Sequence, residues 1–419
     1  MTNSLPRVLI VAEHASARFG GEAFLPLHYF RVLRARGCDV QLLCHARVRQ
    51  ELTELFPHDL ARLHFVPDRA VQVGLHRLGQ RMPARVAART LGIGGHLLTQ
   101  VSQRALARRL VRQHAIDVVH EPIPVSPSQP SLMFGVGAPV VIGPMNGGIG
   151  FPPAFRFMEG PWHVPDWAVR VLSGAANRLL PGKRRAAVLL VANQRTRAAL
   201  PKAVADVPTL TLAENGVDLE RWRSRRTEAE DGRSVRFAFV GRLIELKAVD
   251  ILLEALAPVA RATAARLEIF GEGPERSALE AKTEQLALQN QVNFQGFVSQ
   301  SELAVQLPQC DALILPSLCE CGGAVVLEAM ALGLPVIASN WGGPADYVDE
   351  SCGILAFPDT RESFREQLTS AMLDLASSPE RRRQLGCAAR KKVEEQFDWE
   401  QKVDRMLEIY RFAMDEGCR

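Results

Sequence analysis

Short apolar runs alternate with amphipathic stretches along this chain, and the alternation predicts a parallel α/β fold. Runs rich in β-branched residues predict buried strands at 8–12, 40–44, 116–119, 139–142 and 186–192. Between the first two runs, apolar residues at helical spacing from Phe24 to Leu33 predict a helix, which Gly37 ends. A strand, a helix and a second strand in succession form a βαβ unit, so we expect a doubly wound sheet.

The same pattern restarts near Ser234. Further strands are predicted at 235–240, 265–270, 292–294, 312–315 and 336–338. The helices between them are predicted at 249–260, 277–288 and 325–332. The stretch 201–231, rich in proline and charge, separates the two series, although 209–213 adds a strand. This second alternation is typical of another parallel α/β domain.

The fold class that follows is α/β, with two Rossmann-like doubly wound domains that face a central cleft. We place the first domain at residues 1–205 and the second at 206–395. An amphipathic helix within 396–419 is expected to pack back on the first domain. Ligands of such sheets bind outside the carboxyl ends of the strands, so we expect the functional residues at those ends.

Composition places the chain among cytoplasmic globular proteins. Its 419 residues are 47% hydrophobic and 23% charged, enough to fill two cores. No apolar run reaches the ~18 to 20 residues of a membrane-spanning helix, and the N-terminus lacks the features of a secretory signal. We therefore expect a cytoplasmic protein whose cysteines are reduced thiols.

Charge is distributed unevenly along the chain. Residues 1–210 hold 26 Lys and Arg against 12 Asp and Glu, whereas residues 211–419 hold 24 against 34. Between Arg69 and Arg112 there are nine arginines and no acidic residue. The segment lacks the interleaved aromatic residues of a nucleic-acid surface, so we expect no nucleic-acid partner. It suits peripheral contact with an anionic membrane or a phosphorylated acceptor, and a solvated basic face explains it equally well.

Two motifs in the second half carry candidate chemistry. Glu320 lies in a glycine loop and Glu328 lies eight residues later, in the following helix. The loop allows backbone N–H groups to approach a phosphate or polyol, and a carboxylate on the helix can accept two hydrogen bonds from a diol. Upstream, Arg242 and Lys247 follow a strand and Gly241, and two cations from one loop can hold a pyrophosphate.

Taken in order, the motifs of the chain resemble those of retaining family 4 glycosyltransferases with the GT-B fold. The resemblance covers nearly the whole sequence. The matching motifs are Gly20-Gly21-Glu22, Asp117-Val-Val-His120-Glu-Pro122, Glu214-Asn-Gly-Val-Asp218, Gly241-Arg242 with Lys247, Gly271-Glu-Gly-Pro274, Asn293-Phe-Gln-Gly296, Asp311 before Pro316-Ser317, Glu320 to Glu328, and the run from Glu328 to Ala338.

For the second domain, the resemblance implies a binding site for a nucleotide-diphospho-sugar donor. Glu328 would bind the ribose hydroxyls, Arg242 and Lys247 the diphosphate, and Glu320 the donor sugar. Arg242, Lys247 and Glu320 would also serve catalysis. The further residues that would line the donor site are Gly241, Gly271, Gly273, Val298, Gly322, Gly323 and Ala324.

For the first domain, the resemblance implies that Gly20 and Gly21 meet the donor phosphate and that His120 faces the sugar and acceptor as a catalytic residue. The family transfers a hexose with retention of configuration and without a metal or other cofactor. The sequence agrees in one respect, because it has no Asp-x-Asp pair that would suggest a carboxylate site for Mg²⁺ or Mn²⁺.

Two further stretches of the first half are candidates for contact with the acceptor. After the strand that follows His120, the loop contains Asn146, Gly147 and Gly148, which we expect to contact the acceptor unless they form a plain tight turn. The aromatic, proline-rich segment from 151 to 167 either binds a lipid-linked or saccharide acceptor or packs as an ordered loop on the first domain.

Two alternatives to a transferase remain from the sequence. One is a nucleotide-sugar-binding protein of the same fold that has lost turnover, and the intact set of candidate residues argues against it. The other is an NAD-dependent oxidoreductase. That alternative is weakened because residues 12–17 read Ala-Glu-His-Ala-Ser-Ala in place of the glycine-rich dinucleotide turn. The donor base, the sugar, the acceptor and the linkage cannot be deduced from spacing.

Overall fold

The computed structural model describes residues 5–18, 21–68, 93–159, 166–223 and 234–417. The chain divides into two compact units. Unit 1 comprises residues 1–148, 164–214 and 400–419, and unit 2 comprises residues 149–163 and 215–399. The first unit therefore extends past residue 205. The physical reason is that the strand at 209–211 pairs in parallel with the strand at 188–191 and belongs to the same sheet.

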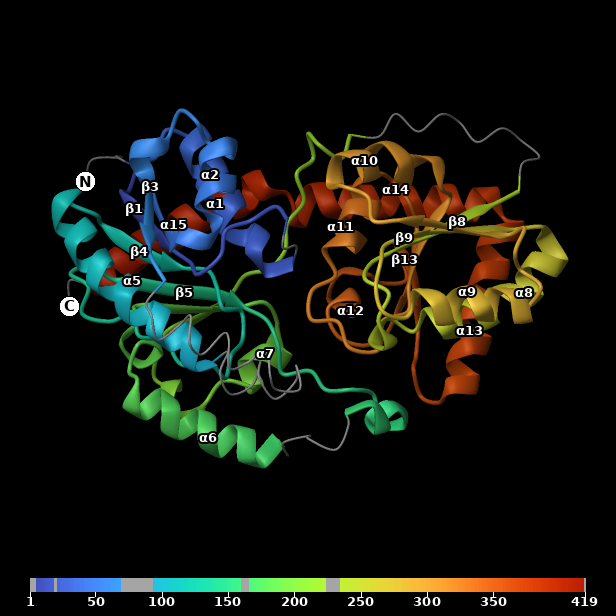
Figure 1. Cartoon of the computed structure of the whole chain (residues 1–419), viewed down its shortest axis with the longest axis horizontal. Coiled ribbons are helices and arrows are strands. Elements are labelled where there is room, and N and C mark those ends of the chain that lie inside the picture. Colours follow the sequence, from blue (N-terminus) through green and yellow to red (C-terminus); the bar gives the residue numbers. More distant parts are fainter. Residues whose placement is uncertain (1–4, 19–20, 69–92, 160–165, 224–233, 418–419) are drawn as a thin grey trace. The chain divides into compact units, whose positions relative to one another are not determined.

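Unit 1 is built on a parallel sheet of seven strands in the order β3-β2-β1-β4-β5-β6-β7 (Figure 1). The strands are β1 (Val8–Val11), β2 (Val40–His45), β3 (Leu63–Val66), β4 (Val118–Glu121), β5 (Val140–Met145), β6 (Val188–Val191) and β7 (Thr209–Thr211). All but β3 follow the predicted runs. Strands β1, β2, β4, β5 and β6 are buried along their whole length, because helices cover both faces of a parallel sheet.

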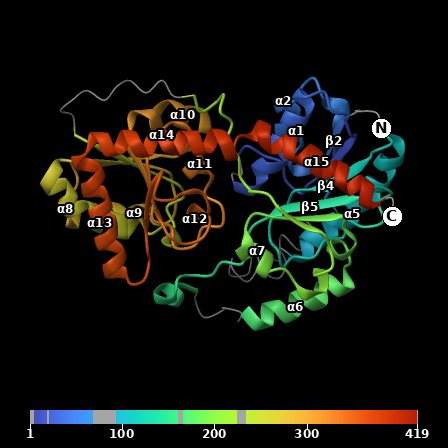
Figure 2. The ribbon, with the colours of Figure 1, turned by 180° about the vertical axis from the view of Figure 1, so that it is seen from behind.

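The helices of unit 1 follow its strands and close the core. They are η1 (Gly21–Ala23), α1 (Phe24–Ala35), η2 (Ala46–Val48), α2 (Arg49–Leu55), η3 (Leu60–Arg62), α5 (Ile93–Gln113), α6 (Asp166–Leu179), η6 (Lys183–Arg185), α7 (Gln194–Ala198), η7 (Lys202–Val204) and, from residue 400 onward, α15 (Trp399–Gly417). On one face of the sheet, Leu9 and Val11 pack in a cluster with Ala107 and Val111 of α5. Figure 2 shows α15 beside α1, and Arg36, the residue after α1, pairs with Glu400 (2.8 Å).

Unit 2 repeats the architecture with six parallel strands in the order β10-β9-β8-β11-β12-β13. The strands are β8 (Arg236–Val240), β9 (Arg266–Phe270), β10 (Val292–Gly296), β11 (Ala312–Leu315), β12 (Val336–Ser339) and β13 (Gly353–Ala356). Its helices are η5 (Pro153–Glu159), η8 (Glu245–Lys247), α8 (Val249–Thr263), α9 (Arg276–Gln285), α10 (Gln300–Gln306), η9 (Leu307–Gln309), α11 (Ala324–Ala331), α12 (Pro344–Tyr347), α13 (Arg361–Ser377) and α14 (Pro379–Gln396). Across both units, none of the described helices combines the length and apolarity needed to cross a membrane.

The segment that contains η5 belongs to unit 2, although unit 1 precedes and follows it in the chain. The indole N–H of Trp341 donates to the Gly150 carbonyl (2.8 Å). Phe155 of the same segment is buried, and it lines a cavity of about 490 Å³ with Ile244 and Leu318 of unit 2. For residues 151–159, the alternative of a loop that packs on the first domain is wrong, because these residues belong to unit 2 and Phe155 has its apolar partners there.

Candidate active site

Glycine loops at the carboxyl edge of the unit 2 sheet form the base of the candidate donor site. The Gly241 N–H donates to the Phe270 carbonyl (2.9 Å), and the Gly271 N–H donates to the Gly296 carbonyl (2.8 Å). A Cβ atom at Gly271 would lie 1.8 Å from the Gly241 oxygen, and one at Gly273 would lie 2.2 Å from the Leu243 oxygen. Only glycine permits backbones to approach so closely, so these residues shape the loops.

Lys247 and Glu320 come together at the point where the strand order of unit 2 reverses. Lys247 ends η8, after β8, and Glu320 follows β11; the two strands are neighbours in the sheet. Their side chains form an ion pair and are only 15% and 18% exposed. The Leu318 N–H donates to the Leu246 carbonyl (2.9 Å) and ties the two loops together. Ligands of doubly wound sheets bind at this switch point, so both predicted residues lie where the fold favours a ligand.

Helix α11 begins directly after this ion pair. Gly323 precedes it with a φ of +78°, in the left-handed region that favours glycine, and no side chain caps the helix. The backbone N–H groups of Ala324 and Val325 at the start of the helix therefore retain their capacity to bind an anion, whereas that of Val326 donates to the Gly323 carbonyl (2.9 Å). The Gly343 N–H holds the Glu320 carbonyl from the other side (2.7 Å). Glu320, Gly322 and Gly323 thus form one loop beside a helix N-terminus.

Glu328 lies farther along α11 and is buried, with 8% of its surface exposed. Burial raises the pKa of its carboxyl group to about 7, although Arg221 and a hydrogen bond oppose the shift. The hydrogen bond comes from Gln300, whose amide nitrogen lies 3.1 Å from the carboxylate, and Arg221 donates to the same Gln300 side chain (2.7 Å). A buried carboxylate with one partner retains lone pairs for a diol.

Arg242 and Val298 lie on the same edge of the sheet, outside the Lys247–Glu320 ion pair. Arg242 is exposed in the loop after β8, and it forms no ion pair within the described residues. Val298 is half-buried after β10, next to the exposed side chain of Phe297. The structure therefore gathers the loop glycines, Lys247 and Glu320 tightly, whereas Arg242 is free to move toward a ligand.

In unit 1, His120 occupies a different place from the one expected. It is fully buried on β4, its Nε2 lies 2.7 Å from the Gly143 carbonyl, and its Nδ1 lies 2.8 Å from the Tyr410 hydroxyl. Tyr29 packs edge-on against the ring (4.8 Å between centroids). Burial lowers the pKa of His120 to about 4. Because both nitrogens are engaged in the core, the expectation that His120 faces sugar and acceptor is wrong.

The loop after β5 is also occupied internally. Asn146 is buried and donates to the Glu214 carboxylate (2.7 Å), and the Gly147 N–H donates to the Thr196 hydroxyl (3.1 Å). A Cβ atom at Gly148 would lie 2.6 Å from Cβ of Ala199. These contacts favour the tight-turn alternative over acceptor binding for Asn146, Gly147 and Gly148. The expectation that this loop contacts the acceptor is therefore wrong.

Of the two glycines expected at the donor phosphate, Gly20 lies outside the described residues. Gly21 opens η1 with a φ of +53°, is exposed, and has no heavy atom within 4 Å of a Cβ built on it. A ligand can therefore approach its backbone without a steric barrier.

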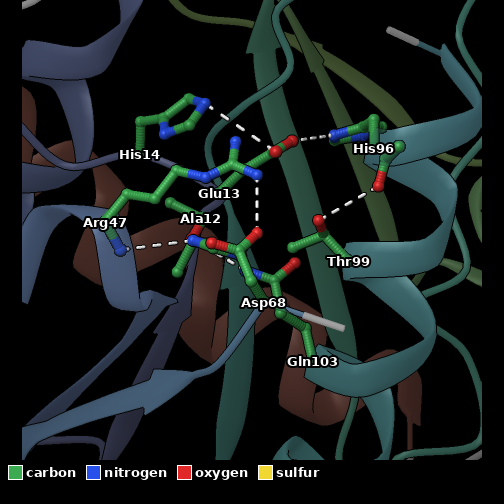
Figure 3. Close-up of polar contacts among 10 residues, drawn as sticks. Ala12, Glu13, His14, Arg47, Asp68, His96, Thr99 and Gln103 are labelled. Carbon is green, nitrogen blue, oxygen red and sulfur yellow. Dashed lines mark hydrogen bonds and ion pairs between the residues drawn. The ribbon is translucent and has the colours of Figure 1, made fainter. Parts of the chain in front are cut away.

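A polar cluster that the sequence analysis missed lies at the carboxyl edge of the unit 1 sheet (Figure 3). The Glu13 carboxylate, two residues beyond β1, lies 2.5 Å from Nδ1 of His96, which is on α5. Burial alone would lower the pKa of His96, but the Glu13 carboxylate outweighs it and the pKa is raised. His14 lies on the far side of Glu13, with its Nε2 3.8 Å from the carboxylate. No spacing rule connects Glu13 with His96, so only the fold reveals the pair.

Comparison with known proteins finds a family match in the second half of the chain. Residues 220–392 match the glycosyl transferases group 1 family. The matched region contains Arg221, Lys247, Glu320 and Glu328, so it includes the ion pair and the buried carboxylate described above.

Curated relatives match about half of the chain. The D-inositol 3-phosphate glycosyltransferase of Segniliparus rotundus is 32% identical over 226 residues, which are 51% of this chain and 49% of that protein. A GDP-mannose-dependent phosphatidylinositol monomannoside mannosyltransferase of Corynebacterium glutamicum is 28% identical over 55% of this chain and 66% of its own length. The chain spans about half the length of the curated relatives it matches.

Solved structures resemble the chain over nearly its whole length. Anabaena HepE in complex with UDP gives a TM-score of 0.65 at 16% identity, over 96% of this chain and 99% of that one. Sucrose-phosphate synthase from Thermosynechococcus elongatus gives a TM-score of 0.65 at 18% identity, over 97% and 98%. At such identities the likeness shows the fold, which is that of two Rossmann-like domains.

Proposed function

We propose that the protein is a retaining glycosyltransferase that moves a hexose from a nucleotide-diphospho-sugar to a saccharide, lipid-linked or small-molecule acceptor, in polysaccharide or glycolipid biosynthesis. The observation that carries the proposal is the Lys247–Glu320 ion pair, held over glycine loops beside the uncapped N-terminus of α11. The relatives support it, since they include a D-inositol 3-phosphate glycosyltransferase and a GDP-mannose-dependent mannosyltransferase.

In the proposed reaction, the bond between the anomeric carbon and the leaving phosphate oxygen breaks while a bond to the acceptor oxygen forms on the same face. The acceptor proton passes to the leaving phosphate. Lys247 and Arg242 supply the positive charge that stabilises the diphosphate, and the first-turn N–H groups of α11 add their dipoles. We therefore propose that the transfer needs no metal ion and no further cofactor. Glu328 holds the ribose hydroxyls through its lone pairs.

The proposal also concerns location. We propose that the protein acts in the cytoplasm and makes peripheral contact with an anionic membrane through the basic segment from Arg69 to Arg112. Residues 69–92 of that segment lie outside the described part of the chain. Its remaining arginines are on α5, where Arg104 donates to the Phe134 carbonyl (2.8 Å) and Arg108 to the Gly135 carbonyl (2.8 Å). These two side chains help to hold the loop that follows β4, so the described part of the segment has a structural role as well.

The proposal is tested first by thermal stabilisation with UDP-, GDP- and ADP-sugars in the absence of metal. A donor at 100 times its Kd raises the stability by about 2.7 kcal/mol. Release of nucleotide from the donor that binds then separates a transferase from a binding protein that has lost turnover. Binding without any turnover on saccharide or lipid-linked acceptors would favour the latter.

The variants Lys247→Ala and Arg242→Ala test the roles of the two cations. Removal of one preorganised charge at a leaving group lowers kcat by roughly 100-fold to 1,000-fold. Lys391→Ala, a change at an exposed lysine of α14, is the matched control and should leave kcat unaltered. Near-normal turnover of Lys247→Ala would overturn the assignment of the donor site.

A further inference from the structure

Helix α6 of unit 1 buries a polar face and exposes an apolar one, which is the reverse of an ordinary surface helix. Its inward side is polar: the Ser173 hydroxyl donates to the Ser128 carbonyl (2.7 Å), and the Asn177 amide donates to the same carbonyl (3.2 Å). Ser173 and Asn177 are buried and lie four residues apart, on one face of the helix. A helix of a water-soluble domain normally presents its apolar side to the core. The reversed arrangement of α6 therefore needs an explanation.

The outward side of α6 is apolar. Trp167 is 70% exposed, Val171 63%, Leu172 65% and Leu179 80%. Figures 1 and 2 show α6 at the margin of unit 1. Large apolar side chains scattered singly on a surface are ordinary, but with Val169, which is 39% exposed, this one helix of 14 residues carries five of them.

Positive charge borders this apolar face. Asp166 is the first residue of α6, and from Trp167 to Arg185 the sequence contains no further acidic residue. Arg170 and Arg178 are exposed on α6, and the exposed Arg184 donates to the Arg178 carbonyl (3.3 Å), which places its guanidinium at the end of the helix. An apolar helix face with arginines along its border and a tryptophan at one end is the composition of helices that lie in a membrane interface.

We propose that α6 is a membrane-docking helix whose face of Trp167, Val171, Leu172 and Leu179 enters the interface of an anionic bilayer. The bordering arginines favour an anionic bilayer over other occupants of this face. A second copy seated on the same face would bring two sets of arginines together with only Asp166 on each helix to offset them, whereas anionic lipid headgroups complement them. The helix is about 21 Å long at 1.5 Å per residue, enough to lie flat with four side chains in the lipid. The inference stands on this surface alone and does not require the proposed transfer reaction.

The test is co-sedimentation of the full chain with vesicles of 70% phosphatidylcholine and 30% phosphatidylglycerol. We expect Leu172→Glu to lower the partition coefficient at least about tenfold, because it replaces a side chain that the lipid buries with a charge. The matched control is Val305→Glu on α10, since Val305 is 69% exposed and lies in unit 2; it should bind as the parent does. Both substitutions are at exposed positions, and circular dichroism checks that each variant folds.

The charge component is tested separately with Arg170→Gln, Arg178→Gln and the double variant. Each change should weaken binding about fivefold on the anionic vesicles and leave the residual binding to pure phosphatidylcholine unaltered. The control is Arg383→Gln, at an exposed arginine of α14. Quenching of Trp167 fluorescence by brominated lipid, absent in Trp167→Phe, would place α6 itself in the bilayer.

Three results would overturn the inference. The first is failure of the parent protein to bind anionic vesicles. The second is loss of binding in Val305→Glu as large as that in Leu172→Glu, which would show an effect of charge alone. The third is a dimer in buffer that Leu172→Glu converts to a monomer, which would assign the face to self-association.

Discussion

Replacing Glu328 with glutamine should make unit 2 more stable and its donor site weaker. The carboxyl group is buried and its pKa rises to about 7 from an ordinary value of 4.5. Since one pKa unit corresponds to about 1.36 kcal/mol, keeping Glu328 ionised in the fold costs about 3 kcal/mol at pH 8. The neutral amide of the variant carries no such cost, so Glu328→Gln should recover up to that amount.

The gain in stability from Glu328→Gln should grow as the pH rises. Below pH 4.5 the carboxyl group is protonated in both the folded and the unfolded chain, so it has no effect on stability. As the pH rises toward 7, the unfolded chain releases this proton first and the folded protein loses stability relative to the variant. The advantage of Glu328→Gln should therefore be under about 1 kcal/mol at pH 5 and about 3 kcal/mol at pH 8.

Calorimetry at the two pH values measures the effect. For a unit of this size, about 3 kcal/mol corresponds to a rise in Tm of roughly 6–12 °C at pH 8. The exposed Glu284 of α9 provides the control, because Glu284→Gln should shift Tm by less than about 1 °C at both pH values. If Glu328→Gln left Tm unchanged at pH 8, or raised it equally at pH 5, burial of a charged carboxylate would not describe this residue.

The same variant should bind nucleotide-sugar about 10-fold to 100-fold more weakly, because hydrogen bonds to a charged acceptor contribute about 1.5–3 kcal/mol each. Titration of the donor that stabilises the parent protein measures this loss. Unchanged affinity together with the predicted gain in stability would separate the two roles and would remove Glu328 from the donor site.

Three further outcomes follow from the contacts described above. Gly271→Ala should destabilise unit 2 by roughly 3 kcal/mol or more and abolish thermal stabilisation by donor, because its Cβ would overlap the Gly241 oxygen; retained stabilisation would contradict the packing of these loops. His120→Leu should lower the free energy of unfolding by about 2–4 kcal/mol, since two buried partners lose their hydrogen bond, while turnover per folded molecule stays within about twofold; a 100-fold loss of kcat in a stably folded variant would restore a catalytic role. Glu13→Gln should lower the pKa of His96, because the carboxylate is what raises it; a histidine titration followed by NMR that shows no decrease would argue against the pair.

Much of the donor side of the protein could be predicted from the sequence. Strand and helix periodicity located the sheets, and the glycines after β8 and β9 marked loops whose backbones touch. Lys247 and Glu320 were singled out by motif order, and they do meet at the switch point of the unit 2 sheet. These signals succeed because glycine turns and strand ends are local features, and because a parallel sheet brings the ends of successive strands to one edge.

The other half of the candidate site could not be deduced in this way. His120 and Glu121 are neighbours on one strand, and spacing alone does not say which of them faces a helix and which a ligand. The structure buries His120 between Tyr29 and Tyr410, which is 290 residues away. It also joins Glu13 to His96 across 83 residues. Such pairs depend on which helix covers which face of the sheet.

The sequence by itself determined the two α/β units, the glycine-shaped loops and the charged residues beside them, because periodicity and turn chemistry are properties of neighbouring residues. Only the tertiary structure decided which polar groups are satisfied in the core and which remain available. In the folded protein His120 and Asn146 are buried, and the apolar side of α6 is exposed. The reason is that burial and hydrogen-bond satisfaction belong to a position in the packed molecule, and distant segments create that position.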